Sequence, residues 1–242
     1  MNLCIDIGNS FYKFGTFDDD KLVSLIRGYN INQVDALKSL DLRQYNQIIF
    51  SASGDIHDDF LEILNAKNHL KIIELTSKTN IPINIHYKSP ETLGKDRIAG
   101  ACGSMLFFPN HSRLIVDLGT CITYNILDNC NNFLGGAISP NIEMRIEAMS
   151  VFTANLPLVE KELPASFIGD DTISSLQNGA VRGTIFEIES FITKFLEKFT
   201  DLKVILTGGG LDFFENKINS KIFAIPNLQI FGLNEILRYN ET

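Results

Sequence analysis

NLCIDIGNS, residues 2–10, and RLIVDLGTC, residues 113–121, are the two stretches that decide the fold. In each, an apolar run ends on an aspartate within the turn motif Asp-x-Gly-(Asn or Thr). A short apolar run bounded by turn residues predicts a buried strand, and the residues after each turn predict a second strand and hence a hairpin. Because each half of the chain contains one copy, we expect two duplicated α/β domains that face one another across a cleft.

The elements expected around these turns alternate between strands and helices. Strands are predicted at residues 2–7, 11–17, 21–26, 47–51, 71–75, 113–118, 121–127, 133–138 and 203–206. Helices are predicted at residues 34–40, 56–66, 142–151 and 173–198. This order is typical of a mostly parallel sheet covered by helices.

Composition restricts the class of protein. The chain has 242 residues, 45% of them hydrophobic and 21% charged, which is typical of a globular protein and excludes a disordered or fibrous one. No apolar run is long enough to span a membrane, and the amino terminus lacks the pattern of a signal peptide, so we expect a soluble, cytoplasmic protein. The net charge of −8 argues against a surface for nucleic acid or anionic membrane and favours a small-molecule partner.

The two turns have the chemistry of a phosphate site. Glycine lets the backbone approach a phosphate closely, and the N–H groups and the Asn or Thr side chain can donate to its oxygens. The aspartate can hold a cation, and Lys13 adds a positive charge on the second strand of the first hairpin. Phosphoryl transfer needs this combination, because its catalysis comes mainly from positioning and from neutralising charge. Either copy alone could be an ordinary strand-end turn, but two copies in matching contexts favour the phosphate site.

A third glycine cluster, Thr207 to Gly210, follows the strand predicted at residues 203–206. Backbone at such a place can pack against a nucleotide, open onto a helix N-terminus, or form a simple turn.

Together, the three motifs resemble those of the actin-like ATPase superfamily, which includes acetate kinase, sugar kinases, Hsp70 and actin. Within that group, the short chain is similar to the type III pantothenate kinases over nearly its whole length. Seven segments carry this resemblance in order: Asp6 to Ser10, Leu93 to Arg97, Asp117 to Thr120, Gly135 to Pro140, Leu156-Pro157, Asp171-Thr172 and Leu206 to Gly209.

The resemblance implies two duplicated actin-like (ribonuclease H-like) α/β domains with mixed sheets that face a nucleotide cleft. Residues 1–112 would carry the first phosphate loop and the substrate loop, and residues 113–242 the second phosphate loop, the long helix and the adenosine-side glycine motif. The residues implied in ATP binding are Asp6, Ile7, Gly8, Asn9, Ser10, Phe11, Tyr12, Lys13 and Thr120. Asp117 would help to hold a monovalent cation, K⁺ or NH₄⁺, and Mg²⁺ would arrive with ATP near Asp6 through water.

Gly94-Lys95-Asp96-Arg97 precedes an apolar stretch, so Asp96 and Arg97 are expected in the first turn of a helix. The helix dipole favours a carboxylate there, and the local sequence alone leaves a capping role with a solvated arginine as an alternative. The resemblance implies that Asp96 accepts the proton of the pantothenate hydroxyl. It also implies that residues 94–97 bind pantothenate, with Arg97 suited to the substrate carboxylate.

By the same resemblance, Tyr87 and Thr172 contact pantothenate, Thr172 across the subunit interface of a homodimer. A half-buried aromatic is the alternative for Tyr87, and an N-cap of the long helix is the alternative for Thr172. Three positions depart from the family pattern: Ser10 replaces a common threonine, Cys121-Ile122 stands where small residues are usual, and Asn141 stands where glycine is common.

The activity implied is the ATP-dependent phosphorylation of pantothenate to 4′-phosphopantothenate, the first step of coenzyme A biosynthesis. Two alternatives stay open: a non-catalytic nucleotide-binding accessory or sensor protein of the same fold, and a kinase for another small hydroxyl substrate. Intact Asp6, Asp96, Arg97, Asp117 and Thr120 favour the enzyme, because a pure sensor needs no proton acceptor.

Overall fold

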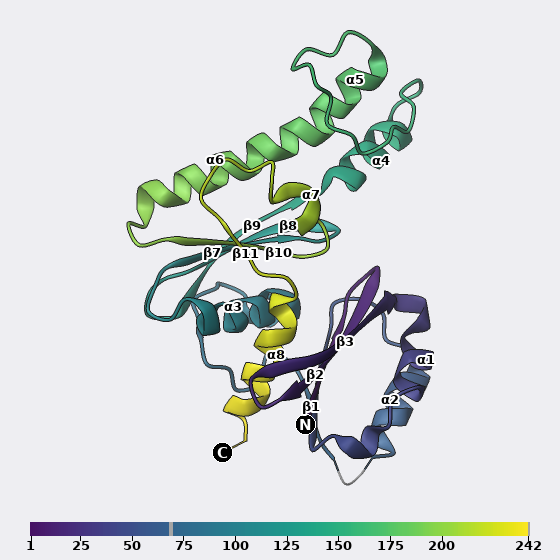
Figure 1. Ribbon diagram of the computed structural model, residues 1–242, viewed down its shortest axis with the longest axis vertical. Coiled ribbons are helices and arrows are strands. Elements are labelled where there is room, and N and C mark those ends of the chain that lie inside the picture. Colours follow the sequence, from purple (N-terminus) through teal and green to yellow (C-terminus); the bar gives the residue numbers. More distant parts are fainter. Residues whose placement is uncertain (68–69, 242) are drawn as a thin grey trace. The chain divides into compact units, whose positions relative to one another are not determined.

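The computed structural model describes residues 1–67 and 70–241, which form two compact units (Figure 1). The first unit contains the described residues of 1–110, 127–135 and 227–242, and the second contains residues 111–126 and 136–226. The division into duplicated domains 1–112 and 113–242 stays a prediction. Within the described residues, no helix combines the length and the apolar character needed to cross a bilayer.

The first unit is built on a mixed sheet of five strands in the order β3-β2-β1-β4-β5. The strands are β1 (Asn2–Ile7), β2 (Phe11–Asp18), β3 (Lys21–Tyr29), β4 (Gln47–Ala52) and β5 (Lys71–Glu74). β1 runs antiparallel to β2 and parallel to β4, and β4 runs parallel to β5. The strands predicted in this half are confirmed. β3 continues past its predicted end because it pairs with β2 as far as Tyr29, opposite Phe11.

The helices of this unit are α1 (Gln33–Lys38), α2 (Asp58–Asn65), α3 (Lys95–Phe107) and α8 (Leu228–Tyr239). Short 3₁₀ turns lie at Asn30–Asn32, Leu42–Gln44 and Pro90–Thr92, and a short strand, β6, is Asn84–Ile85. The predicted α1, α2 and α3 are confirmed. α8 is not among the predicted helices, because it is buried around most of its circumference and so lacks the polar face that marks a surface helix.

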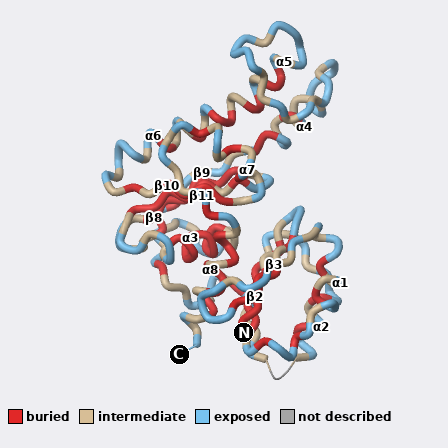
Figure 2. Tube along the Cα trace, in the orientation of Figure 1, coloured by how far each residue is buried: buried red, intermediate tan, exposed pale blue. Residues whose placement is uncertain are grey.

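Alternate residues of β1 point to opposite faces of the sheet, and different helices bury each face. Ile5 and Ile7 belong to a core that includes residues of α1 and α2, whereas Cys4 contacts Asn234 of α8. Both faces of the strand are therefore covered, which explains its mostly apolar sequence. Figure 2 colours this strand, next to the N-terminus, mostly as buried. Asp6 is in step with Cys4, so its side chain lies on the face that α8 covers.

α3 and α8 touch backbone to backbone through two glycines. A Cβ on Gly103 would lie 2.3 Å from the carbonyl oxygen of Leu228, and a Cβ on Gly232 would lie 1.7 Å from that of Ala99. No side chain fits at either position, so the two helices are held as close together as their backbones allow.

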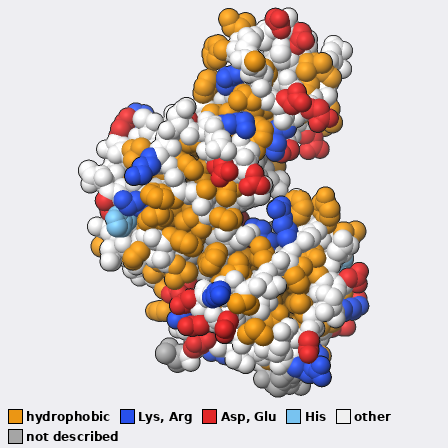
Figure 3. Space-filling model, in the orientation of Figure 1, with side chains coloured by type: hydrophobic (Ala, Val, Ile, Leu, Met, Phe, Trp, Pro, Cys, Tyr) orange, Lys and Arg blue, Asp and Glu red, His pale blue; other side chains and the backbone are white. Residues whose placement is uncertain are grey.

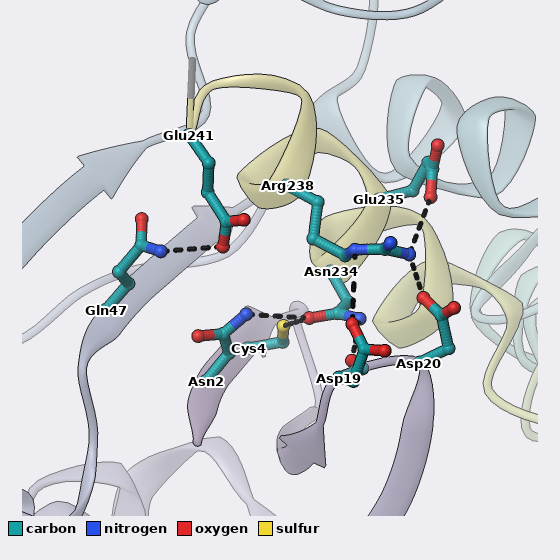
Figure 4. Close-up of polar contacts among 9 residues, drawn as sticks. All are labelled: Asn2, Cys4, Asp19, Asp20, Gln47, Asn234, Glu235, Arg238 and Glu241. Carbon is teal, nitrogen blue, oxygen red and sulfur yellow. Dashed lines mark hydrogen bonds and ion pairs between the residues drawn. The ribbon is translucent and has the colours of Figure 1, made fainter.

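Polar side chains tie α8 to the sheet (Figure 4). Asn234 accepts a hydrogen bond from the Asn2 amide at 3.4 Å and donates to the carbonyl oxygen of Asp19 at 2.9 Å. Arg238 forms an ion pair with Asp20 in the turn between β2 and β3. α8 therefore links α3 to β1, the strand that carries Asp6.

The strands of the second unit's sheet are β7 (Arg113–Leu118), β8 (Cys121–Leu127), β9 (Asn132–Pro140), β10 (Lys203–Thr207) and β11 (Phe223–Ala224). The sheet has the order β11-β10-β7-β8-β9-β6, and β10 runs parallel to both β7 and β11. β6 pairs with Asn132 and Phe133, the first two residues of β9, which belong to the first unit. The strands predicted in this half are confirmed, whereas β6 and β11 are too short to show a periodic pattern.

Four helices accompany these strands: α4 (Ile142–Phe152), α5 (Thr172–Gln177), α6 (Gly183–Lys198) and α7 (Leu211–Phe214). A π-helical turn, Asn178–Arg182, joins α5 to α6, so the long helix predicted at residues 173–198 is confirmed in extent and contains this irregular turn. Ile188 and Ile192 of α6 pack in one core with Leu114 and Val116 of β7.

Candidate active site

The first Asp-x-Gly turn brings together charged side chains from three elements. Asp6 of β1 pairs in register with Lys13 of β2 and Ser51 of β4, and the Ser51 hydroxyl donates to Asp6 Oδ1 at 3.2 Å. Burial raises the pKa of Asp6, Lys13 lowers it, and the carboxylate of Asp96 in the first turn of α3 raises it. Asp6, Lys13 and Asp96 therefore lie within electrostatic range of one another.

Backbone contacts fix the shape of this turn. The Gly8 N–H donates to the Phe11 carbonyl oxygen at 2.9 Å and closes the turn. Gly54, which follows β4, packs so closely that a Cβ there would lie 2.3 Å from the Gly8 carbonyl oxygen. The backbone at Gly54 therefore packs directly against the backbone of the turn at Gly8, with no side chain between them.

The residues predicted to bind ATP differ in exposure. Asn9, Ser10 and Phe11 are exposed, whereas the side chains of Ile7 and Tyr12 belong to the core. Ile7 and Tyr12 can therefore reach a ligand only through their backbone, and the exposed side chains of the turn come from Asn9 to Phe11.

The loop predicted to bind substrate is the start of α3. Gly94 is the N-cap, and its missing side chain leaves room for the next residue but one, since a Cβ on Gly94 would lie 2.5 Å from Asp96 Oδ1. The Lys95 ammonium lies 3.2 Å from Glu74 Oε1 of β5. No side chain caps this helix, so the alternative of a capping role for Asp96 is wrong.

Arg97 is held between two aromatic rings. Its side chain is buried, and its Cζ atom lies 5.7 Å from the ring centroid of Tyr87 and 5.5 Å from that of Phe133. The two rings meet edge to face with centroids 6.2 Å apart. The alternative of a solvated arginine is therefore wrong, because this guanidinium sits in a fixed, water-poor setting. Tyr87 is half-buried and is part of that setting.

The second Asp-x-Gly turn lies in the second unit, against the third glycine cluster. Asp117 of β7 pairs in register with Thr207 of β10. Gly208 has a φ of +96°, and a Cβ there would lie 2.3 Å from Asp117 Oδ1. The Gly210 N–H donates to the Leu118 carbonyl oxygen at 2.8 Å. The glycine cluster therefore forms one wall of the turn that carries Asp117.

Thr172 is exposed at the start of α5. The N-cap of α5 is Asp171, whose carboxylate accepts from the Ser174 N–H at 2.7 Å, so the N-cap alternative for Thr172 is wrong. Thr172 instead lines a cavity of about 530 Å³ together with Met149 and Leu156. Among the described residues, no other predicted site residue lines this cavity.

Ser51, Gly54 and Phe133 lie beside predicted site residues and are not themselves predicted. Ser51 and Gly54 reach Asp6 and Gly8 through the pairing of β1 with β4, which no local pattern reveals. The sequence offers one indication for Phe133, because this residue lies two positions before Gly135 to Pro140, one of the segments that carry the family resemblance.

Comparisons with known proteins identify the family. A family model described as type III pantothenate kinase matches residues 2–194. A type III pantothenate kinase from Cytophaga hutchinsonii is 38% identical over 240 residues, which cover 99% of this chain and 100% of that protein.

Two solved structures share the fold at low sequence identity. A candidate Baf-family transcriptional activator from Campylobacter jejuni aligns with a TM-score of 0.62 at 22% identity, covering 98% of both chains. A candidate N-acetylmannosamine kinase from Listeria monocytogenes aligns with a TM-score of 0.57 at 12% identity, covering 99% of both chains. At such identities the likeness speaks for the fold alone, and it confirms the predicted class of duplicated actin-like α/β domains. The family match and the full-length relative together show that the chain belongs to the type III pantothenate kinases.

Proposed function

We propose that the residues around Asp6 and Asp96 are the catalytic centre of this pantothenate kinase. The family uses ATP and a divalent metal to phosphorylate pantothenate, the first step of coenzyme A biosynthesis. One observation carries the proposal: Asp6, Lys13 and Asp96 come from separate parts of the chain and lie within electrostatic range of one another. Phosphoryl transfer requires this grouping of a cation-binding carboxylate, a phosphate-binding cation and a second carboxylate able to take a proton.

Asp96 is the proposed proton acceptor. The first turn of α3 fixes its backbone, and Gly94 leaves the space that its carboxylate occupies. The pantothenate hydroxyl would give its proton to this carboxylate as the γ-phosphoryl group arrives. Because the transition state is loose, we expect the base to contribute on the order of 10²-fold to the rate.

Asp6 is the proposed place for Mg²⁺. Its pKa is raised by burial and by Asp96 even though Lys13 is near, so its negative charge is incompletely balanced by the protein. A cation that enters with ATP would balance it, and Mg²⁺ would be held through water because it keeps much of its hydration shell. When bound, the ion neutralises charge on the phosphate chain.

Arg97, Tyr87 and residues 94–95 are proposed to hold pantothenate. A guanidinium can bind the substrate carboxylate with two hydrogen bonds, and the rings of Tyr87 and Phe133 fix its orientation beforehand. Because Glu74 pairs with the Lys95 ammonium, the proposed contribution of Lys95 is its backbone N–H in the first helical turn.

The second turn is proposed to bind phosphate oxygens of ATP. Thr120 is exposed, and its hydroxyl and backbone N–H are the groups that would meet phosphate oxygens. Asp117, beside Gly208, is the proposed ligand of K⁺ or NH₄⁺. A monovalent cation there would offset repulsion between the phosphates and the protein's carboxylates, and it needs no redox chemistry.

A homodimer and a cytoplasmic location, where ATP is available, go with this proposal. Exposed apolar side chains are concentrated between residues 151 and 173, and they include Phe152 at 85% and Ile168 at 74% exposure. In Figure 3, hydrophobic atoms lie at the surface over the part of the second unit that carries α4 and α5. A second copy would cover such a surface and bring a partner to Thr172.

Release of ADP by the purified chain tests the proposal. The assay contains ATP and Mg²⁺, with and without pantothenate, first in potassium and then in sodium buffer. We expect release that requires pantothenate and is faster in potassium. ATP binding without ADP release in either buffer would favour the accessory or sensor protein, and release only with another small alcohol would favour another kinase. Equal rates in both buffers would remove the monovalent cation from the proposal.

A further inference from the structure

Asn141, between β9 and α4, contacts the second phosphate turn directly. Its side-chain Nδ2 donates to the Gly119 carbonyl oxygen at 2.7 Å, and its backbone N–H donates to the Thr120 carbonyl oxygen at 3.4 Å. Its Oδ1 accepts from the Ile142 N–H at 2.7 Å and so caps α4. The residue is buried, with only 4% of its surface exposed. One side chain therefore joins the turn to the start of a helix.

The backbone of Asn141 does not require glycine. Its φ is −77° and its ψ 176°, an extended conformation that any residue adopts. The departure from the family's common glycine therefore leaves the loop geometry intact and adds an amide group that uses both of its polar atoms.

The position of Asn141 is itself held from α4 and α6. Arg145 Nε donates to the Pro140 carbonyl oxygen at 2.8 Å, and the Arg145 guanidinium pairs with Glu187 of α6. Glu187 also accepts from the Tyr124 hydroxyl at 2.9 Å. Burial raises the pKa of Glu187, but hydrogen bonds from Ser139, Arg145 and Tyr124 outweigh burial and lower it overall, so the carboxylate stays charged at neutral pH.

The contact to Gly119 determines where the next N–H points. A trans peptide places its C=O and N–H on opposite sides, and no cis peptide is found among the described residues. The bond that holds the Gly119 carbonyl toward Asn141 therefore turns the N–H of Thr120 away from Asn141. An exposed turn with its donor already oriented loses less freedom when an anion binds.

We propose that Asn141 is a positioning residue that orients the Thr120 N–H for the phosphates of the nucleotide. This inference rests on the proposed role of the Asp117 to Thr120 turn as a phosphate site. The inference goes beyond that role because it names Asn141 as the side chain that holds the turn in its shape before the nucleotide binds.

The variant N141S separates the two hydrogen bonds of the side chain. Serine is a good N-cap, so the cap of α4 is kept, but its shorter side chain cannot donate to the Gly119 carbonyl. We expect the KM for ATP to rise about fivefold, the worth of one hydrogen bond, while kcat and the KM for pantothenate change less than about twofold. N141D is the second variant, because it keeps the cap and the volume and lacks the donor. It should also raise the KM for ATP.

Two further variants make the outcome decisive. D41A removes the N-cap hydrogen bond that the Asp41 carboxylate accepts from the Arg43 N–H in the first unit, and it should leave the KM for ATP unchanged. T120A tests the turn itself and should raise the KM for ATP. If T120A raises it while N141S and N141D behave like D41A, Asn141 has no positioning role and the phosphate site stands. If T120A and both Asn141 variants leave it unchanged, the phosphate site and the inference fail together.

Discussion

Burial and the nearby Asp96 carboxylate both raise the pKa of Asp6, and the surroundings of the two residues suit the different roles proposed for them. Asp6 accepts a hydrogen bond from Ser51 and lies near Lys13, which is how a cation-holding carboxylate is fixed. Asp96 lies in the first turn of a helix beside Arg97 and is the carboxylate assigned to the substrate. The two residues share an electrostatic environment and are proposed to face different ligands, so their positions alone would give these neighbouring acids different roles.

Replacing Asp96 with Asn separates these tasks. We expect D96N to bind ATP as the parent chain does and to lose about 100-fold or more in kcat, because asparagine cannot take the proton. The same change removes a neighbouring negative charge, so the pKa of Asp6 should move down toward its ordinary value. Steady-state kinetics, nucleotide-binding calorimetry and NMR titration of the Asp6 carboxyl measure the three effects. Near-normal turnover in D96N would remove Asp96 from the mechanism.

At the scale of elements, the distance between Asp6 and Asp96 depends on the stack of α3, α8 and β1. α3 carries Asp96 at its start and touches α8 at Gly103, and α8 is tied to β1 through Asn234. α8, which contains none of the predicted site residues, therefore sets the geometry of the proposed catalytic pair.

Two glycines on the same helix test this dependence. A Cβ on Gly103 would lie 2.3 Å from the Leu228 carbonyl oxygen, whereas a Cβ on Gly100 meets nothing within 4 Å. G103A should force α3 and α8 apart, lower the free energy of unfolding by about 2 kcal/mol and reduce kcat/KM. G100A should keep activity and stabilise the helix by up to ~1 kcal/mol, because alanine is the better helix former. Urea unfolding and kinetics compare them, and equal stability of the two variants would contradict the prediction.

The strands were predictable because their signals are local. β1 and β7 are apolar runs that end at turn residues, so their bounds follow from neighbours in the chain. α8 could not be predicted in this way, because a helix buried on most sides has no polar face and therefore lacks the alternation of apolar and polar residues that marks a helix. The residues of the candidate site also fall into those that local sequence could identify and those that it could not. Asp6 and Asp96 could be proposed from motifs, whereas Ser51 and Phe133 join them only through strand pairing and packing between distant segments.

At the scale of the whole molecule, the main feature is the exposed apolar surface formed by residues between 151 and 173. A soluble monomer rarely exposes a large apolar patch, and Val151, Phe152 and Phe167 are each at least 66% exposed. This surface includes the neighbourhood of Thr172, so the proposed subunit contact and the proposed substrate contact occupy one region of the second unit.

Replacing Phe152 with Ser should weaken the homodimer, because the side chain with 85% exposure loses its apolar area. We expect a shift toward monomer in light scattering and a higher KM for pantothenate, since Thr172 is proposed to act across the interface. V23S is the matched control, an apolar residue with 47% exposure on the edge strand β3 of the first unit. A parent chain that is monomeric at working concentration and fully active would overturn this prediction.

The place of α8 in the chain also affects how the protein is made. α8 covers the face of the sheet on which Asp6 lies, yet residues 228–239 are translated after every residue of the second unit. While the ribosome is still adding those later residues, Phe17 of β2 and Phe107 of α3 lack Phe231 of α8, the ring that packs against both. Uncovered apolar side chains of this kind are what chaperones recognise. The face of the sheet on which Asp6 lies is therefore among the last parts to form, and a nascent chain that stops before residue 228 lacks the helix that covers it.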